Sequence, residues 1–258
     1  MKKIKLLLTF LICFFLMILA SCGKNSSSQT EMQKTSGLTK TTNAPINLGR
    51  AENFAIIASS SISSTPNSTI TGKVGLVPGL RAQITLLPSE VVGGSSEIYA
   101  ADDTNPDSHL FLENAHKDLI AASVEFDIKE ADADKIGKFN GFLGGKTLTA
   151  GSYKWNSRVA INSDLILEGS PTDVWIFHGT ANFNMANDVH VILKGGAKAK
   201  NVFWLIDGSL RLAERSELVG TVIVQKIFTM QSFASLNGRA FSLNGNIVLD
   251  NNAITMPE

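Results

Sequence analysis

Apolar residues recur at a fixed interval in the C-terminal part of the chain. Two series show this: Leu218, Leu236 and Ile254 at intervals of 18 residues, and Leu212, Met230 and Leu249 at intervals of 18 and 19. A repeat of this length indicates one structural unit stacked on itself. Eighteen residues of extended chain trace roughly 60 Å, enough for one coil of three short strands and their corners. The pattern therefore predicts a mainly β protein, a β-solenoid.

Other apolar runs of strand length support this prediction. They cover residues 53–58, 147–155, 159–167, 174–177, 189–193, 202–206 and 218–224. Pro66, Pro78 and Gly79 mark corners between runs. Residues 195–200 are inserted between two otherwise equivalent runs, so we expect an irregular solenoid.

One segment departs from the β pattern. Apolar residues spaced three and four apart predict an amphipathic helix over about residues 108–126, with residues 107–108 as its N-cap. These apolar residues are Phe111, Ala115, Leu119, Ala122 and Phe126. An apolar stripe of this kind needs a surface to cover, and we expect the helix to lie along the side of the solenoid.

The N-terminus has the features of an export signal. Three lysines precede an apolar run that is too short for a membrane span, and the run ends at Cys22. The sequence Leu-Ala-Ser-Cys resembles a bacterial lipobox, so we expect residues 1–21 to be removed and Cys22 to carry lipid. Residues 22–45 are polar and predict a solvated tether, and residues 46–258 a single domain. We therefore expect an exported protein anchored by lipid to the bacterial cell envelope, at the outer membrane or cell surface.

Composition limits the chemistry of this domain. Both cysteines, Cys13 and Cys22, lie in the leader region, so the domain contains neither a disulfide nor a thiolate. After loss of the leader lysines the chain carries 20 basic and 23 acidic residues, which does not favour nucleic-acid binding. His109 and His116 are seven residues apart on the predicted helix, about 10.5 Å along its axis, too far to share one metal. The sequence contains no motif of a hydrolase or a phosphate-binding loop. We expect no enzyme, no metal and no cofactor, and a monomer.

Several segments, in order, resemble the microbial ice-binding-protein family. They are residues 48–58, 62–66, 70–75, 148–155, 173–177 and 195–204, and the resemblance covers residues 46–256. It implies an irregular right-handed, three-faced parallel β-helix with one long helix along its side. It also implies binding to ice, or its ordered water, through a flat face rich in Thr, Ala, Gly and Asn. Coils stack about 4.8 Å apart and alternate residues lie about 6.7 Å apart, so such a face can hold ordered water.

The face that would bind ice can be predicted by alternation along one strand of each coil. We take Val159, Ala181, Phe183 and the Leu212 series as inward and their neighbours as outward. The outward candidates for ice binding are Thr180, Asn182, Ser209, Thr229 and Asn246, with Thr69 and Thr71 as an N-terminal extension beside Ser61 and Ser63. Threonine suits this role because its methyl group excludes bulk water, its hydroxyl anchors water, and its χ1 is stiff.

Three basic residues depart from the family pattern. Arg158 and Arg211 are predicted to point outward from the same face, and Lys226 stands where threonine is common. Long charged side chains disturb a regular water layer. The alternative is an adhesion or matrix module of the envelope that binds glycan or protein on the same scaffold, and the Ser and Thr residues would then be ordinary solvent-facing positions.

Overall fold

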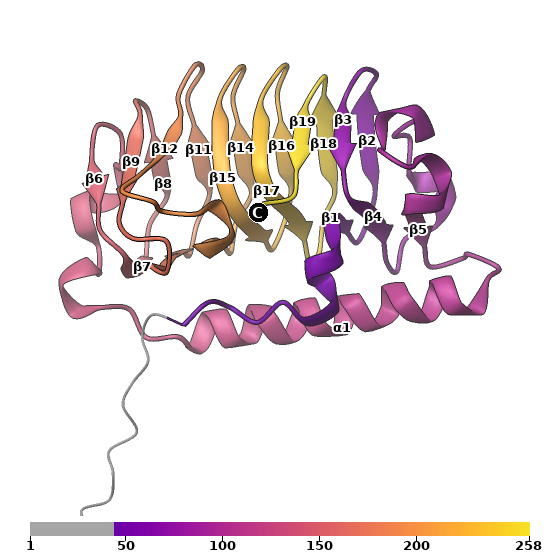
Figure 1. Cartoon of the computed structure of the whole chain (residues 1–258), viewed down its shortest axis with the longest axis horizontal. Helices are drawn as coiled ribbons and strands as arrows, with labels where there is room; N and C mark the ends of the chain where they lie inside the picture. The colour runs from indigo at the N-terminus through magenta and orange to yellow at the C-terminus, as the bar shows by residue number, and fades with distance from the viewer. Residues whose placement is uncertain (1–43) are drawn as a thin grey trace, which may run out of the picture. The chain divides into compact units, whose positions relative to one another are not determined.

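The computed structural model describes residues 44–258; the predicted leader, Cys22 and nearly all of the tether lie outside this range. The described chain forms parallel coils with three faces, as predicted, and one helix lies along one face (Figure 1). No helix within residues 44–258 combines the length and apolar character that a membrane span needs.

Sheet A, the face next to the helix, is buried on both sides. Its strands, in spatial order, are β5 (Ile98–Ala100), β4 (Lys73–Leu76), β1 (Phe54–Ala58), β17 (Ser235–Ser242), β15 (Glu217–Val224), β13 (Val202–Ile206), β10 (Trp175–Gly179) and β7 (Gly151–Trp155). Ile176 and Phe203 face the helix, whereas Trp175 and Trp204 point into the solenoid. This double burial explains why these strands are continuous apolar runs.

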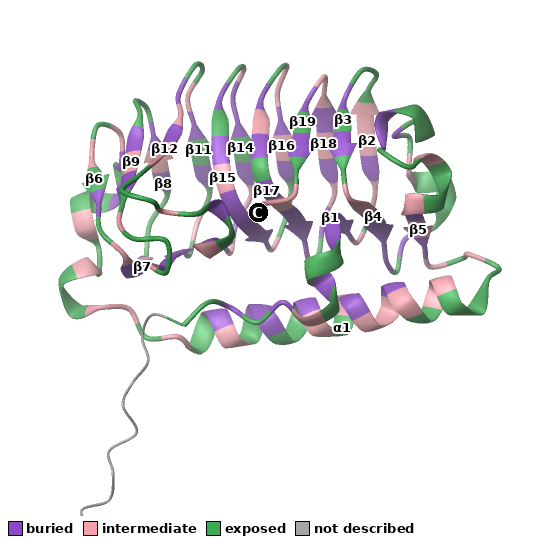
Figure 2. Cartoon of the chain, in the orientation of Figure 1, coloured by how far each residue is buried: buried purple, intermediate pink, exposed green. Residues whose placement is uncertain are grey.

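Sheet B forms the second face. Its order is β2 (Ile62–Thr65), β18 (Ile247–Asp250), β16 (Phe228–Met230), β14 (Leu210–Leu212), β11 (Phe183–Met185) and β8 (Val159–Ile161). Buried and exposed residues alternate along these strands, as expected for a sheet with one face in the core (Figure 2).

The third face is formed by shorter strands and by the first halves of β15 and β17. The short strands are β6 (Thr147–Leu148), β9 (Leu165–Glu168), β12 (Val191–Lys194), β19 (Ala253–Thr255) and β3 (Thr69–Thr71). Leu218, Leu236 and Ile254 are paired here in register, which confirms the 18-residue repeat. β15 and β17 pass from this face into sheet A at Gly220 and Gly238, where the backbones touch: a Cβ on Gly238 would lie 1.8 Å from the Gly220 oxygen.

The coils do not stack in chain order. The C-terminal coil β17–β18–β19 pairs with the N-terminal coil β1–β2–β3 on all three faces. The last strands therefore lie in the middle of the molecule, and the N-terminal coils extend it beyond them (Figure 1).

Helix α1 (Pro106–Ile128) connects the two ends of the solenoid. Its 23 residues span about 35 Å, close to the roughly 34 Å of eight strands spaced 4.8 Å apart. Ala115, Leu119, Ala122 and Phe126 are buried on sheet A, as predicted. Leu112, which was not predicted, is buried with them, whereas Phe111 is only partly buried. The predicted N-cap at residues 107–108 was wrong: Asn105 caps the helix by accepting from the Asp107 amide, because Pro106 fits the first helical position.

Short 3-10 helices form the remaining regular structure of residues 44–258. They are η1 (Gly49–Asn53), η2 (Arg81–Gln83), η3 (Pro88–Glu90), η4 (Gly94–Glu97), η5 (Ala133–Lys135), η6 (Lys138–Gly141) and η7 (Ala199–Asn201).

An aromatic column fills one half of the solenoid. The rings of Phe177 and Trp204 stack 4.1 Å apart, and Tyr153 and Trp155 continue the column. Each buried indole N–H reaches a backbone carbonyl, for example Trp204 to Val219 at 2.9 Å. The three tryptophans are at most 1% exposed and belong to the core.

Candidate functional site

Two faces of the solenoid are free of the helix. Sheet A is covered by α1, whose apolar side packs against Ile176, Phe203 and Ile223 (Figure 1). A flat contact with an external surface must therefore use sheet B or the third face.

The outward side chains of sheet B form two rows across all six strands. The first row, just before each strand, is Arg158, Asn182, Ser209, Ile227, Asn246 and Ser61. The second row, at the middle of each strand, is Ala160, Asn184, Arg211, Thr229, Val248 and Ser63. Unbroken parallel register keeps neighbours in a row about 4.8 Å apart and the two rows about 6.7 Å apart.

Four of the predicted site residues share this surface. Asn182, Ser209 and Asn246 lie in the first row and Thr229 in the second. Ser61 and Ser63 extend both rows beside Asn246 and Val248. The sheet B surface therefore combines short polar side chains with small or branched apolar ones.

The predicted position of Thr180 was wrong. Thr180 lies in the corner after β10, where its amide continues the sheet A ladder by bonding to the Trp155 oxygen. The strand begins two residues later than the alternation suggested, so Ala181 is a corner residue and Met185 points inward. Asn184, which we did not predict, is the outward residue of this strand. In this strand the side chains of Phe183 and Met185 point into the core, and the side chain of Asn184 between them points outward.

Thr69 and Thr71 do not extend sheet B. The corner at residues 66–68, where Asn67 has a φ of 91°, turns the chain onto the third face. There β3 pairs with β19, which places both threonines beside Ala253 and Thr255, followed by Ser235 and Asn237. The predicted residues thus divide between two surfaces because one corner separates them.

The third face is smaller and interrupted. The inserted segment with η7 packs against the first halves of β15 and β17, beside a hollow of about 530 Å³ lined by Ala197, Lys198, Asn237 and Thr255, among others. Farther along, His190 lies between Asp164 and Glu217, with its Nδ1 3.2 Å from the Asp164 carboxylate. The inserted segment covers one part of the third face, and the charged side chains around His190 interrupt another. The part formed by β17, β19 and β3 keeps a regular row of outward side chains.

The basic residues on sheet B are partly held by neighbours. Arg158, at the edge strand, has its guanidinium 5.8 Å from the ring of Phe142. Arg211 donates to the Gln231 amide oxygen at 2.5 Å. Lys226 lies in the corner before β16 and, with Arg158, Asn182 and others, lines a hollow of about 450 Å³ at the β8–β11–β14 side. The regular half of the surface is therefore centred on β16, β18 and β2.

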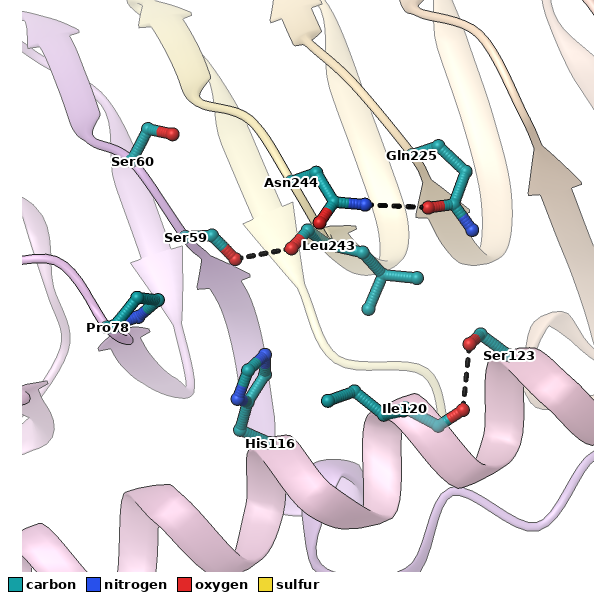
Figure 3. A pocket seen from close by; sticks show the side chains of 9 residues that line it. All are labelled: Ser59, Ser60, Pro78, His116, Ile120, Ser123, Gln225, Leu243 and Asn244. Atoms are coloured by element: carbon teal, nitrogen blue, oxygen red, sulfur yellow. Dashed lines mark hydrogen bonds between the residues drawn. The ribbon is translucent and has the colours of Figure 1, made fainter.

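A cleft of about 510 Å³ separates α1 from the corners that follow sheet A (Figure 3). Its polar groups are bonded locally: Ser59 donates to the Leu243 oxygen at 2.6 Å, and Asn244 to the Gln225 amide at 2.9 Å. Burial lowers the pKa of His116, which lines the cleft. No nucleophile is paired with a base among these side chains.

Metal binding finds no site in the described part of the chain. Within residues 44–258, no three His, Asp or Glu side chains are arranged to hold an ion. The buried His178 lies 3.3 Å from both oxygens of Asp207. This contact and that of His190 with Asp164 are side-chain contacts between neighbouring coils.

Known proteins share both the sequence and the fold. A family profile described as ice-binding-like matches residues 56–255. The chain is 36% identical to an ice-binding protein of Flavobacterium frigoris over 243 residues, covering 91% of this chain and 84% of the relative. It is 34% identical to an ice-binding protein of a Colwellia species, covering 82% and 84%.

Solved structures agree with this assignment. The domain of ice-binding protein 1 from Shewanella frigidimarina superposes with a TM-score of 0.78 at 26% identity, covering 84% of this chain and 99% of that one. An ice-binding protein with antifreeze activity from an Arctic yeast gives 0.78 at 30% identity, covering 83% and 95%. On its sequence, its coils and its lateral helix, this chain belongs to the ice-binding-like family.

Proposed function

We propose that this protein binds ice through the outward surface of sheet B. One observation carries the proposal: two rows of mostly short side chains cross six strands in unbroken register on a face that α1 leaves free. The names of its relatives support it, since they are ice-binding proteins and antifreeze activity is stated for the Arctic yeast protein.

The chemistry of the two rows suits ordered water. The hydroxyls of Thr229 and Ser63 and the amide of Asn246 can anchor water molecules at the spacing of the strands. Val248 and Ile227 between them exclude bulk water without competing for hydrogen bonds. Ladder hydrogen bonds already fix the strands that carry these rows. The protein therefore loses little conformational entropy when water orders over the surface.

Arg211 works against this surface. It stands in the second row between Asn184 and Thr229. Its hydrogen bond to Gln231 holds the charged guanidinium over the outward surface of sheet B. We therefore expect Arg211→Thr to increase thermal hysteresis, because the substitution extends the polar and small row by one strand.

The experiment compares two threonines on different faces. Thr229→Tyr puts a large ring in the middle of sheet B, whereas Thr255→Tyr puts the same ring on the third face. Thermal hysteresis and inhibition of ice recrystallisation are measured with each purified variant. We expect Thr229→Tyr to abolish activity and Thr255→Tyr to leave it unchanged, with both melting like the parent.

Other outcomes assign the function differently. Loss of activity only in Thr255→Tyr would move the ice contact to the third face. A parent protein that neither shapes ice nor slows recrystallisation would refute ice binding and leave the adhesion or matrix role on the same scaffold. The proposed function needs no catalysis and no cofactor, and one copy of the chain suffices for it.

We further propose that the protein is a lipoprotein of the bacterial envelope, held by lipid on Cys22. The apolar leader, the Leu-Ala-Ser-Cys sequence and the polar segment after it support this. Mass spectrometry of the mature N-terminus should find acylated Cys22, and Cys22→Ser should release the protein from membranes. An unmodified N-terminus elsewhere would refute the anchor.

A further inference from the structure

One end of the solenoid exposes large apolar side chains. Ile136 is 59% exposed, Phe142 47% and Phe139 40%. They belong to the partial coil that closes the solenoid beyond β7 and β8: Ile136 is bridged to Lys154 and Phe142 to Ala160. Together with Lys138, Lys146 and Arg158 they form what we call the tip.

The backbone of the tip holds Phe139 outward in a costly conformation. Phe139 and Asn140 have φ values of 54° and 52°, flanked by Gly137 and Gly141 at 65° and 79°. A left-handed backbone is unfavourable for a bulky residue, and a glycine would relieve it. The turn is fixed from below, because Trp155 donates its indole N–H to the Lys138 oxygen at 2.7 Å. An exposed ring kept at such a cost indicates a use outside the core.

Basic groups surround the rings. The ammonium groups of Lys146 and Lys138 lie 5.0 and 5.9 Å from the Phe139 ring centroid, and the Arg158 guanidinium lies 5.8 Å from that of Phe142. Residues 128–158 carry six Lys or Arg against three Asp or Glu, whereas the rest of residues 44–258 carries 11 against 19. The tip is thus the basic end of an otherwise acidic domain.

The chain enters the described domain near the same end. Lys129, which caps the C-terminus of α1, donates to the Ala44 oxygen at 2.6 Å. Forty-three residues precede Ala44, and the predicted lipid site at Cys22 is among them. A lipid at Cys22 would therefore be joined to the domain at this end of the solenoid.

We propose that the tip is a membrane-docking surface that places the rings of Phe139 and Phe142 among the headgroups of an anionic bilayer. Exposed phenylalanine rings bury at the boundary between headgroups and acyl chains, and Lys and Arg beside them are attracted to anionic lipid. The solenoid then stands with its axis along the membrane normal, and sheet B, which runs along that axis, is left clear. This docking does not depend on the lipid anchor or on ice binding.

The test uses the chain from Gly23 onward, so that no lipid can attach, and vesicles of phosphatidylcholine with or without phosphatidylglycerol. We expect co-sedimentation with the anionic vesicles that weakens as salt is raised. Phe139→Gly should reduce the affinity by about tenfold, because the lost ring accounts for much of the apolar contact. The glycine suits the left-handed backbone, so a lower affinity cannot be ascribed to misfolding.

Phe233 supplies a matched control. It is also an exposed phenylalanine with a positive φ, of 63°, but it lies in the corner between β16 and β17. Phe233→Gly should bind vesicles like the parent, and Lys138→Gln with Lys146→Gln should lose the preference for anionic lipid. Equal binding by Phe139→Gly and the parent, an equal loss in Phe233→Gly, or no preference for anionic vesicles would each overturn the proposal.

Discussion

Asn252 joins three coils in the middle of the molecule, and its replacement should measurably destabilise the fold. Its side chain accepts from the Asp250 amide at 2.7 Å and donates to the oxygens of Gln231 and Ala234 at 2.8 and 2.9 Å. Its own amide donates to Ser68 of the N-terminal coil. At 2% exposure, water cannot replace these partners.

Asn252→Ala removes the three side-chain hydrogen bonds. At about 1 kcal/mol each, the free energy of unfolding should fall by about 3 kcal/mol. For a domain of this size each kcal/mol corresponds to about 2–4 °C, so Tm should fall by roughly 6–12 °C. Differential scanning calorimetry measures this loss, provided that unfolding is reversible.

Two comparison variants test the reasoning. Asn237→Ala removes an exposed amide from the third face and should shift Tm by less than about 2 °C. Asn252→Asp places a carboxylate beside the carbonyl oxygens of Gln231 and Ala234. The Tm of this variant should therefore be lowest at neutral pH and should rise as the carboxyl is protonated. A decrease in Tm below about 2 °C for Asn252→Ala would refute the assigned role of this side chain.

Three other substitutions test the packing. Gly238→Ala should prevent folding or cost at least about 4 kcal/mol, since its Cβ would meet the Gly220 oxygen; soluble yield and Tm check this, and a variant melting with the parent would contradict it. Trp204→Ala should cost about 3–5 kcal/mol by opening a cavity beside Phe177, visible as a lower denaturation midpoint. Burial lowers the pKa of His116 below 6.5, so the unfolded chain binds a proton at this residue more readily than the folded protein does. The free energy of unfolding should therefore decrease as the pH falls below about 6.5. His116→Leu should show a smaller decrease in Tm than the parent between about pH 7.5 and pH 5.

Much of the fold could be predicted from periodicity. The 18-residue spacing of Leu218, Leu236 and Ile254 survives in the structure because each coil must return its inward side chains to the same place. The helix was predictable for a similar reason, since one stripe of it packs on sheet A. Such patterns are local, and packing preserves them.

The site was harder to predict because corners are irregular. A corner of two additional residues before β11 moved Thr180 off sheet B and brought Asn184 onto it. The corner at Asn67 carried Thr69 and Thr71 to another face. A strand two residues out of phase still alternates correctly, so alternation alone could not detect the shift. The large apolar side chain of Met185, two residues after Phe183, could have shown that residues 183 and 185 are the inward pair of this strand.

The order of the coils has a consequence for how the chain can fold. A solenoid whose coils stack in sequence can grow from any point, because each unit contacts only its neighbours. Here the Ser59 hydroxyl donates to an oxygen 184 residues later, and the first coil, which pairs with residues 73–91 on one side, lacks its other partner until the last strands are present. Such non-local pairing slows folding and ties the two ends of the chain into one cooperative event. The first coil can complete its pairing in the middle of the molecule only once residues 235–255 have been made.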